Sequence, residues 1–461
     1  MINKSMQSYS SFFSKDYTEL RIQENRQNII GLVNGDVVQN AQSSTSGVSS
    51  RVYKDGHWGF SSNPNIDDSA VEAVIKSSSD NVKFLNRRDT SRCGLILPDT
   101  LFNYEMDHTS SKNKNEQKFW INFLKEIDQY IVRKYPKIIS RTLMMNSLDM
   151  EKSLLTATGS TSFSMTPKSH FYAILTTEKD GQPIKLVETH GGLGQLEDNF
   201  NQPEDYFKSI DIQVEHLIDK ANGVYANAGE REVILAADLA GILAHEAIGH
   251  TTEADLVMGG SVAGHNLDKQ VASPLISLVD FANTYNGEIC PVPVHVDDEG
   301  TESKDVTIIK DGILKNFMHN KDSARHFGSK PTGNARAFMF SDEPLIRMRN
   351  TAIMPGKSNL EDMIASIEDG YYLIKPGNGQ ADSTSEFMFA VNLGYEIKNG
   401  KIGRAIYDTT ISGIAFNMLK TVSMVSSDMK WESAGMCGKK QPIPVGMGGP
   451  AIKCKLNIGG R

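Results

Sequence analysis

Cysteine is scarce in this chain: only four residues, Cys93, Cys290, Cys437 and Cys454, occur in 461 positions. Four widely separated cysteines are too few to hold a fold of this size together by disulfides, which excludes the small disulfide-rich class. We therefore expect a reducing compartment. A chain of this length can bury its own core and is long enough for two domains.

Runs of basic residues and long apolar runs are also missing. The 48 basic and 56 acidic side chains give a formal net charge of −8, and no Lys/Arg cluster marks a nucleic-acid-binding surface. No segment approaches the roughly 18 consecutive apolar residues of a membrane helix, and residues 1–17 lack the apolar core of a signal peptide. We expect a cytoplasmic protein with no direct nucleic-acid partner and no membrane association.

Glycine is frequent, with 38 residues against 16 prolines, and several glycines follow Asn or Asp, as they do in tight hairpin turns. Asn34-Gly35 and Asp55-Gly56 predict an antiparallel meander that starts at residue 19. Further strand-like runs, the last two joined by an Asp180-Gly181 turn, cover residues 137–148, 170–178 and 184–188.

Three segments of the first half have helical spacing: residues 67–77, 115–133 and 203–221. The third of them ends at Asn222-Gly223, a typical helix stop. In the second, apolar residues that recur at helical spacing predict a face packed in the core; they are Phe119, Trp120, Phe123, Ile127 and Ile131.

The second half of the chain consists mostly of short strand-like runs. The polar segment 225–230 precedes it and is typical of a domain boundary. Because helices and strands do not alternate regularly, the predicted fold class is α+β rather than a parallel α/β sheet. We expect an N-terminal α/β domain over residues 1–226, with meander strands and helices, and a C-terminal β-rich domain over residues 227–461.

One motif carries chemistry: His245 and Glu246, followed by His250, on a predicted helix that starts near Asp238. In the common zinc peptidase motif, His-Glu-x-x-His, two imidazoles four residues apart share one helix face. Here the spacing is five, which on a regular helix separates them by about 140°. Either a π-type turn realigns them, or the helix ends at Gly249 and His250 is redirected. Otherwise one histidine is an ordinary polar residue and Glu246 is solvated.

A catalytic zinc site needs a third protein ligand and an open position. The spacing does not choose among six candidates, which are Glu253, Asp255, His265, Cys290, Cys437 and Cys454. Cys437 has the most favourable setting, because glycines flank it and a nearby lysine favours its thiolate. The alternative for Cys437 is an ordinary buried or loop cysteine.

At these residues the sequence resembles the TldD/PmbA family, the modulators of DNA gyrase that are understood as zinc-dependent peptidases. The resemblance rests mainly on LAHEAIGHTTEADLV and on GMCGK followed by PIPVGMGGP. It departs from the family pattern just after the cysteine, where an additional glycine is expected before the glutamine.

In that family the active TldD-type member carries HExxxH and its TldE (PmbA-type) partner lacks it, so this chain is similar to the active subunit. The resemblance implies that His245, His250 and Cys437 are Zn²⁺ ligands and that Glu246 is the catalytic carboxylate. It also implies a heterodimer with a TldE-type subunit, with a homodimer as the alternative, that hydrolyses unfolded or short peptides and affects gyrase only indirectly. Two other functions stay open, a non-catalytic peptide-binding protein and a zinc amidase that acts on a small substrate.

Overall fold

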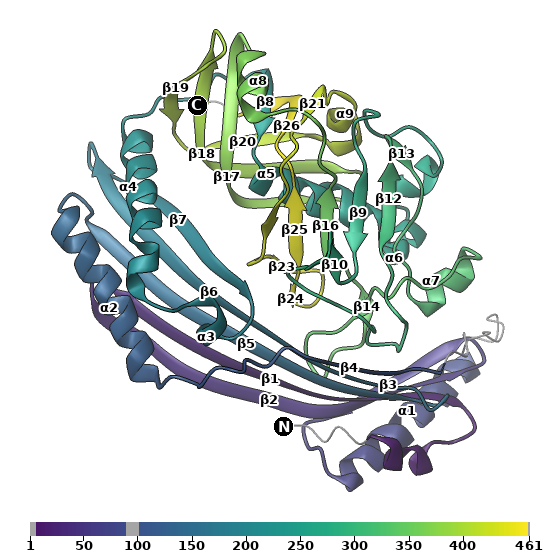
Figure 1. The fold of residues 1–461 in the computed structure, drawn as a ribbon. Coiled ribbons are helices and arrows are strands. Elements are labelled where there is room, and N and C mark those ends of the chain that lie inside the picture. Colours follow the sequence, from purple (N-terminus) through teal and green to yellow (C-terminus); the bar gives the residue numbers. More distant parts are fainter. Residues whose placement is uncertain (1–5, 89–100, 460–461) are drawn as a thin grey trace.

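The computed structural model describes residues 6–88 and 101–459; Cys93 lies outside them. Its first half is built on one long, curved sheet that passes beneath the second half (Figure 1). The strand order is β3-β2-β1-β5-β6-β4, and β7 pairs with the other end of β6. The strands are β1 (Tyr17–Val33), β2 (Asp36–Lys54), β3 (His57–Asn63), β4 (Asn103–Asp107), β5 (Ser140–Thr156), β6 (Thr161–Lys179) and β7 (Gln182–Leu193).

The predicted hairpin turns are confirmed. Asn34-Gly35 joins β1 to β2, Asp55-Gly56 joins β2 to β3, and Asp180-Gly181 joins β6 to β7. Both residues of each pair have positive φ, between 47° and 93°, as a two-residue turn with the twist of a hairpin requires. Asn, Asp and Gly tolerate this left-handed conformation better than other residues do.

Strands β5 and β6 are longer than predicted. The first is predicted to end at Leu148, but β5 continues to Thr156 through the charged residues Glu151 and Lys152. The charges are accommodated by pairing: Glu151 binds Arg26 at 2.7 Å, and Lys152 binds Asp298 at 2.7 Å. The second of these pairs links the two halves of the protein.

The first half also contains three main helices, α1 (Asp68–Arg88), α2 (Gln117–Lys134) and α4 (Phe207–Ala221). Helix α1 extends well past its predicted end at Ser77, because Ser78 is buried and donates to the carbonyl of Val74, and Val82 continues the buried face. In α2 the predicted apolar face is in the core, except that Phe119 is 41% exposed. Short helical segments are η1 (Gln7–Phe12), α3 (Leu196–Asn199) and η2 (Pro203–Tyr206).

Beside three two-stranded sheets, two large sheets make up most of the second half as the structure describes it. One has the order β17-β8-β26-β20-β18-β19, with β21 also paired to β26, and the other has the order β13-β12-β9-β16-β25-β22. Their strands are β8 (Gly229–Leu235), β9 (Leu278–Phe281), β12 (Val306–Lys310), β13 (Ile313–Leu314), β16 (Asn350–Ile353), β17 (Asp369–Ala381), β18 (Glu386–Lys398), β19 (Lys401–Ile406), β20 (Thr409–Ile414), β21 (Met424–Val425), β22 (Lys430–Glu432), β25 (Gly446–Gly449) and β26 (Ile452–Ile458).

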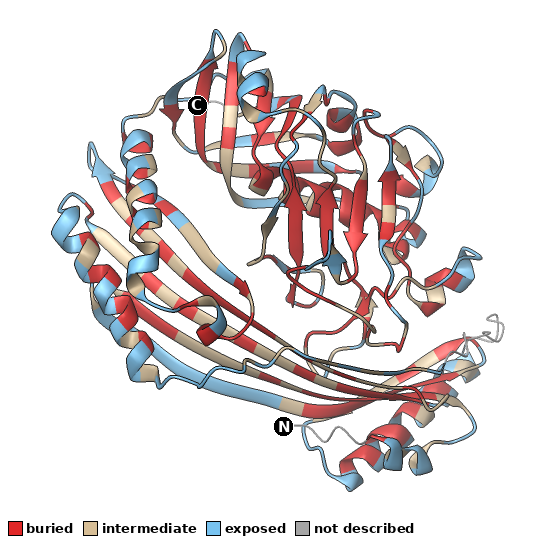
Figure 2. Ribbon diagram, viewed as in Figure 1, coloured by how far each residue is buried: buried red, intermediate tan, exposed pale blue. Residues whose placement is uncertain are grey.

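Helix α5 (Ala237–Leu243) lies between these two sheets, against β17 on one side and β25 on the other. Strands β9, β16 and β25 are fully buried around it (Figure 2). A side chain at Gly241 would press on the backbone of Gly448, so the glycine permits close packing of α5 on β25. This packing fixes the position of the chain that follows α5.

Smaller elements connect the sheets. They are η3 (Ala244–Gly249), η4 (His250–Thr252), α6 (Ala254–Met258), η5 (Val262–Asn266), β10 (Thr284–Tyr285), β11 (Glu288–Ile289), α7 (Lys321–His326), β14 (Ala335–Arg336), β15 (Leu345–Ile346), α8 (Leu360–Ala365), α9 (Ala415–Lys420), β23 (Met436–Cys437) and β24 (Ile443–Pro444).

The mixture of helices with antiparallel and mixed sheets confirms the α+β class. The two halves share part of their core, because Leu393, Tyr395 and Ala405 pack with the cluster that contains α2 and α4. The domain division at residues 226 and 227 stays a prediction. Among the described residues, no helix has both the length and the hydrophobicity needed to cross a membrane.

Candidate metal centre

The unusual spacing of the two histidines is resolved by the helix itself. Helix α5 passes directly into η3, a π-helical segment that carries His245, and His250 follows as the first residue of the 3₁₀ segment η4. A π turn is wider than an α turn, so side chains five residues apart lie on the same side. Gly249 keeps helical angles (φ −55°, ψ −53°), so the π turn, and not a redirection at the glycine, is the alternative that the structure contains.

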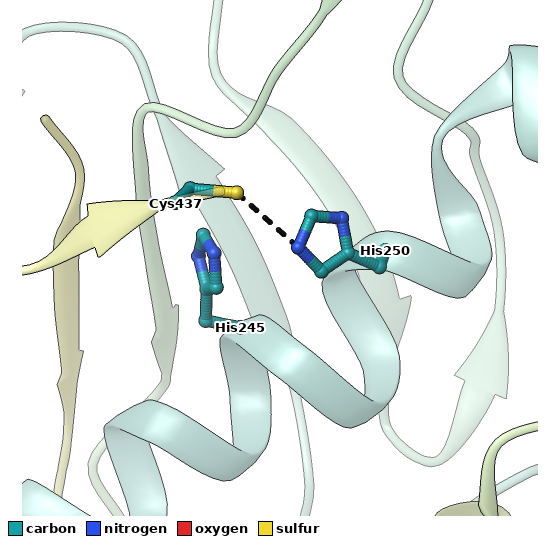
Figure 3. Close-up of side chains that lie close together, drawn as sticks. All are labelled: His245, His250 and Cys437. Atoms are coloured by element: carbon teal, nitrogen blue, oxygen red, sulfur yellow. Dashed lines mark hydrogen bonds between the residues drawn. The ribbon is translucent and has the colours of Figure 1, made fainter. Parts of the chain in front are cut away.

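Three side chains meet at this turn: His245, His250 and Cys437 (Figure 3). Their possible ligand atoms all lie within 4.8 Å of one another. Sγ of Cys437 is 3.3 Å from Nε2 of His250, and the two imidazole centroids are 5.1 Å apart. One cysteine and two histidines around one point are a typical ligand set for a transition metal.

The other candidates for a third ligand lie elsewhere or have other partners. His265 is exposed on η5, Cys290 packs with Val279 and Phe281, and Cys454 lies on β26 opposite β8. Burial raises the pKa of the Cys290 thiol to about 12, and that of Cys454 likewise. Neither of these two cysteines belongs to the group of side chains that surrounds His245 and His250.

The residues of the cluster fit a metal. His245 is completely buried, and neither of its ring nitrogens has a hydrogen-bond partner among the described residues. An unsatisfied buried polar atom costs about 1–3 kcal/mol, so two such atoms on one ring are unusual unless a ligand is bound. A metal coordinated by one of these nitrogens would account for the arrangement.

Charge at the cluster also favours a cation. Burial raises the pKa of the Cys437 thiol, but the adjacent His245 and His250 lower it more, to about 3. Burial lowers the pKa of His250, but Glu253 and Cys437 outweigh it and raise this pKa to about 10. The cluster therefore contains a thiolate, the form of cysteine that binds metals, and the proton on His250 is the one that a metal would displace.

Glu246 lies beside the cluster on the same turn. Its Oε2 is 3.7 Å from Nε2 of His250, and its side chain is 29% exposed. This carboxylate therefore lies near Nε2 of His250, the nitrogen that faces Cys437, and is also accessible to solvent. That is the position a general base needs if it is to take a proton from a water molecule next to a metal.

Comparison with known proteins places this site in a family. Residues 228–460 match the sequence profile of the PmbA/TldA metallopeptidase C-terminal domain, and residues 18–82 match that of PmbA/TldA metallopeptidase domain 1. The chain belongs to the TldD/PmbA family. It is 30% identical to the zinc metalloprotease TldD homolog of Saccharolobus solfataricus over 422 residues, which cover 90% of each chain. As a member of this family it is a metallopeptidase.

Two solved structures of low sequence identity have the same fold. A Thermotoga maritima protein described as a candidate modulator of a DNA gyrase superimposes with a TM-score of 0.77 at 20% identity, over 96% of both chains. TldE from Thermococcus kodakarensis gives a TM-score of 0.74 at 18% identity, over 99% of both chains. The TldD/PmbA fold thus extends over nearly the whole chain.

Sequence reasoning missed the residues that support the candidate ligands. Glu253, weighed only as a ligand, accepts a hydrogen bond from Nδ1 of His250 at 2.8 Å. Lys439 binds Glu253 at 3.1 Å and Asp255 at 2.7 Å. Two features of the sequence could have indicated them: Glu253 follows His250 by three residues, and Lys439 follows Cys437 by two.

A second supporting residue, Arg347, is fully buried and holds the loop after Cys437. Its guanidinium donates to the carbonyls of Cys437, Lys439 and Gln441 at 2.7–3.0 Å. Lys440 within this loop has φ 57°, a left-handed conformation that favours glycine. The additional glycine that the family pattern predicts before the glutamine is missing next to this residue.

Proposed function

We propose that this protein is a zinc-dependent peptidase that hydrolyses unfolded or short peptides. The observation that carries the proposal is the convergence of His245, His250 and Cys437 beside the partly exposed carboxylate of Glu246. Zinc accepts two imidazoles and one thiolate in a tetrahedral site and leaves a fourth position open. The name of the Saccharolobus relative supports zinc as the metal.

In the proposed mechanism, His245, His250 and Cys437 would hold the zinc, which when bound supplies Lewis-acid chemistry. Glu246 takes a proton from the attacking water and delivers it to the leaving amine of the cleaved peptide bond. Because its side chain is partly exposed, water and substrate can reach it. Glu253 holds the His250 ring so that Nε2 faces the cluster.

The thiolate ligand has a consequence for rate. Its negative charge makes the zinc a weaker Lewis acid than three neutral histidines would. We therefore propose a slow or selective peptidase rather than a general digestive one.

We further propose that the chain works with a TldE-type subunit, as the TldD-type member of a heterodimer that encloses the site. The similarity in fold to TldE from Thermococcus kodakarensis supports the proposal only to the extent that both subunits share one architecture. A homodimer is the alternative. Copurification from the native host, followed by mass measurement of the assembly, distinguishes the two.

The test of the function compares the parent protein with Glu246→Gln, both assembled with any copurified partner. The expected result is equal zinc content and a loss of peptide cleavage of about 10²-fold or more.

A second pair of variants tests the third ligand. Cys437→Ser should lose zinc on dialysis. Cys290→Ser should keep it, because Cys290 is a buried cysteine outside the cluster. Cleavage by Glu246→Gln at the parent rate would refute the role of Glu246. Zinc without peptide turnover in the parent would indicate a peptide-binding protein, and turnover of small amides alone would indicate an amidase.

A further inference from the structure

A narrow cavity lies between the two halves of the protein. None of the three candidate metal ligands lines it, although Leu148 and Met150 of its wall pack in the same hydrophobic cluster as Cys437. Its floor consists of side chains from β4, β5 and β6, and its roof is the segment 292–298 together with Arg336 and Pro444. Its volume is about 80 Å³, several times the roughly 15 Å³ that one ordered water needs. The cavity can therefore hold a small organic molecule.

Two buried cations face this cavity without a counter-ion. Nζ of Lys168, a residue only 5% exposed, donates to the carbonyl of Ser433. Arg336, 6% exposed, donates to the carbonyls of Met348 and Pro444. Among the described residues, neither cation forms an ion pair with a carboxylate. Burial of an unpaired charge is costly, so each of them is an unusual residue to find inside a fold.

The acidic residues of the lining are already occupied. Asp298 accepts from Nζ of Lys152 and from the amide of Ala337. Asp297 accepts from three backbone amides, those of Glu299, Thr301 and Ala335. Of the other titratable groups in the lining, Tyr104 has its pKa raised by burial, and His295 has its pKa lowered first by burial and then by His108. Positive charge is therefore in excess in this cavity.

The two cations also repel each other. Burial lowers the pKa of Lys168 to about 7; Arg336 contributes to this decrease and outweighs Glu432, which raises the pKa. Burial and then Arg347 lower the pKa of Arg336 to about 10, despite Asp298 and Asp280. An anion between Lys168 and Arg336 would relieve this repulsion and return the charge to Lys168.

We propose that this cavity is a binding site for an organic carboxylate that carries a short apolar group. The carboxylate lies between Nζ of Lys168 and the guanidinium of Arg336, and the apolar group lies against Leu148, Met150 and Val292. The apolar part of the lining favours such a ligand over inorganic phosphate, which is strongly hydrated and carries more charge. The proposal goes beyond peptide hydrolysis and does not rest on the metal.

The test uses the full chain after removal of metal with a chelator, so its outcome is independent of the proposed peptidase function. Binding of isovalerate is measured by titration calorimetry at constant ionic strength, with isovaleramide as the uncharged analogue of equal shape. We expect isovalerate to bind at least tenfold more tightly than isovaleramide and than inorganic phosphate. Equal affinity for the acid and the amide, or a preference for phosphate, would overturn the proposal.

Substitution of Lys168 locates the site. Lys168→Met removes the charge but retains an unbranched side chain, and it should weaken isovalerate binding at least tenfold. The matched control is Lys220→Met, since Lys220 is also buried and donates to a backbone carbonyl, but it has a carboxylate partner, Asp408. Lys220→Met should keep the parent affinity. Thermal unfolding checks that both variants fold, and unchanged affinity in folded Lys168→Met would overturn the proposal.

The carboxylate could come from a small free acid or from the C-terminus of a peptide. The tripeptide Gly-Gly-Leu and its C-terminal amide distinguish these sources. Competition with isovalerate by the free tripeptide but not by its C-terminal amide would assign the site to a chain terminus. Binding of isovalerate without competition from the tripeptide would assign it to a small free acid. Binding of neither acid would refute the site.

Discussion

The carboxylate of Glu253 lies 2.8 Å from Nδ1 of His250, on the side of the ring opposite the nitrogen that approaches Cys437. A buried carboxylate that accepts from the far nitrogen of a ligating histidine fixes the tautomer and the orientation of the ring. Lys439 contacts both Glu253 and Asp255, and it lies two residues from Cys437. One charged network therefore connects the elements that carry His250 and Cys437.

From this network we predict that Glu253→Gln weakens zinc binding by about 10–100-fold. The substitution keeps the shape of the side chain but removes the charge that stabilises the hydrogen bond from His250. Zinc affinity can be measured by competition with a chromogenic chelator. Asp255→Asn is the control, because Asp255 contacts Lys439 but not His250, and it should have the smaller effect. Equal zinc affinities in the parent and in Glu253→Gln would contradict the positioning role.

The local elements were predictable where a few neighbouring residues determine the conformation. The three Asn/Asp-Gly turns are of this kind, since both positions require positive φ. The end of α1 was not predictable in this way, because the serines after residue 76 are typical of a helix stop. In the fold, the hydroxyl of Ser78 donates to the carbonyls of Val74 and Ser50, and the helix continues.

The candidate site was predictable only in part. The helix with His245 and His250 follows from local pattern, but that pattern left open whether a π turn or a redirection at Gly249 brings the two histidines together. Cys437 lies 187 positions from His250, so spacing could not select it among six candidates. Its glycine-flanked setting favoured it, and the family resemblance selected it. The sequence did not indicate Arg347, because this residue binds three backbone carbonyls. Contacts with the backbone leave no motif in the sequence.

The contact between Gly249 and Met348 gives a second prediction. A methyl group at Gly249 would collide with Sδ of Met348, so in Gly249→Ala either the buried Met348 side chain or the π turn must shift. We expect a loss of about 1–3 kcal/mol in the free energy of unfolding, with weaker zinc binding. Gly438→Ala is the matched control in the same site, since no atom lies within 4 Å of an added Cβ there.

Combination with Met348→Ala tests the cause of this effect. If the collision is responsible, the double variant loses less stability than the sum of the two single variants. Urea denaturation of the four proteins measures the difference. Strict additivity would show that Gly249 acts through something other than this contact.

A third prediction concerns pH. Burial lowers the pKa of His319 to about 4, whereas the unfolded chain has an ordinary histidine pKa of about 6.5. The unfolded state therefore binds the extra proton between these values, so stability is fully present above pH 6.5 and decreases as pH falls toward 4. His319 contributes up to about 1.4 kcal/mol per pH unit to this decrease.

His319→Gln isolates this contribution, because all other titrating groups are common to the two proteins. The free energy of unfolding of metal-free protein is measured in urea between pH 7 and pH 4.5. We expect a shallower decrease in His319→Gln than in the parent. Parallel curves would mean that His319 titrates with the same pKa in the folded and the unfolded state.

The last prediction follows from the loop after Cys437. Lys440 is exposed and has φ 57°, a conformation that costs a residue with a Cβ roughly 1–2 kcal/mol. Glycine avoids this cost but gains about 0.5–1 kcal/mol of freedom in the unfolded state. We therefore expect Lys440→Gly to stabilise the protein by about 0.5–1 kcal/mol in urea denaturation. Lys440→Ala keeps the Cβ and should give no gain, which separates backbone conformation from the loss of the lysine charge; an equal gain in both variants would assign the effect to charge.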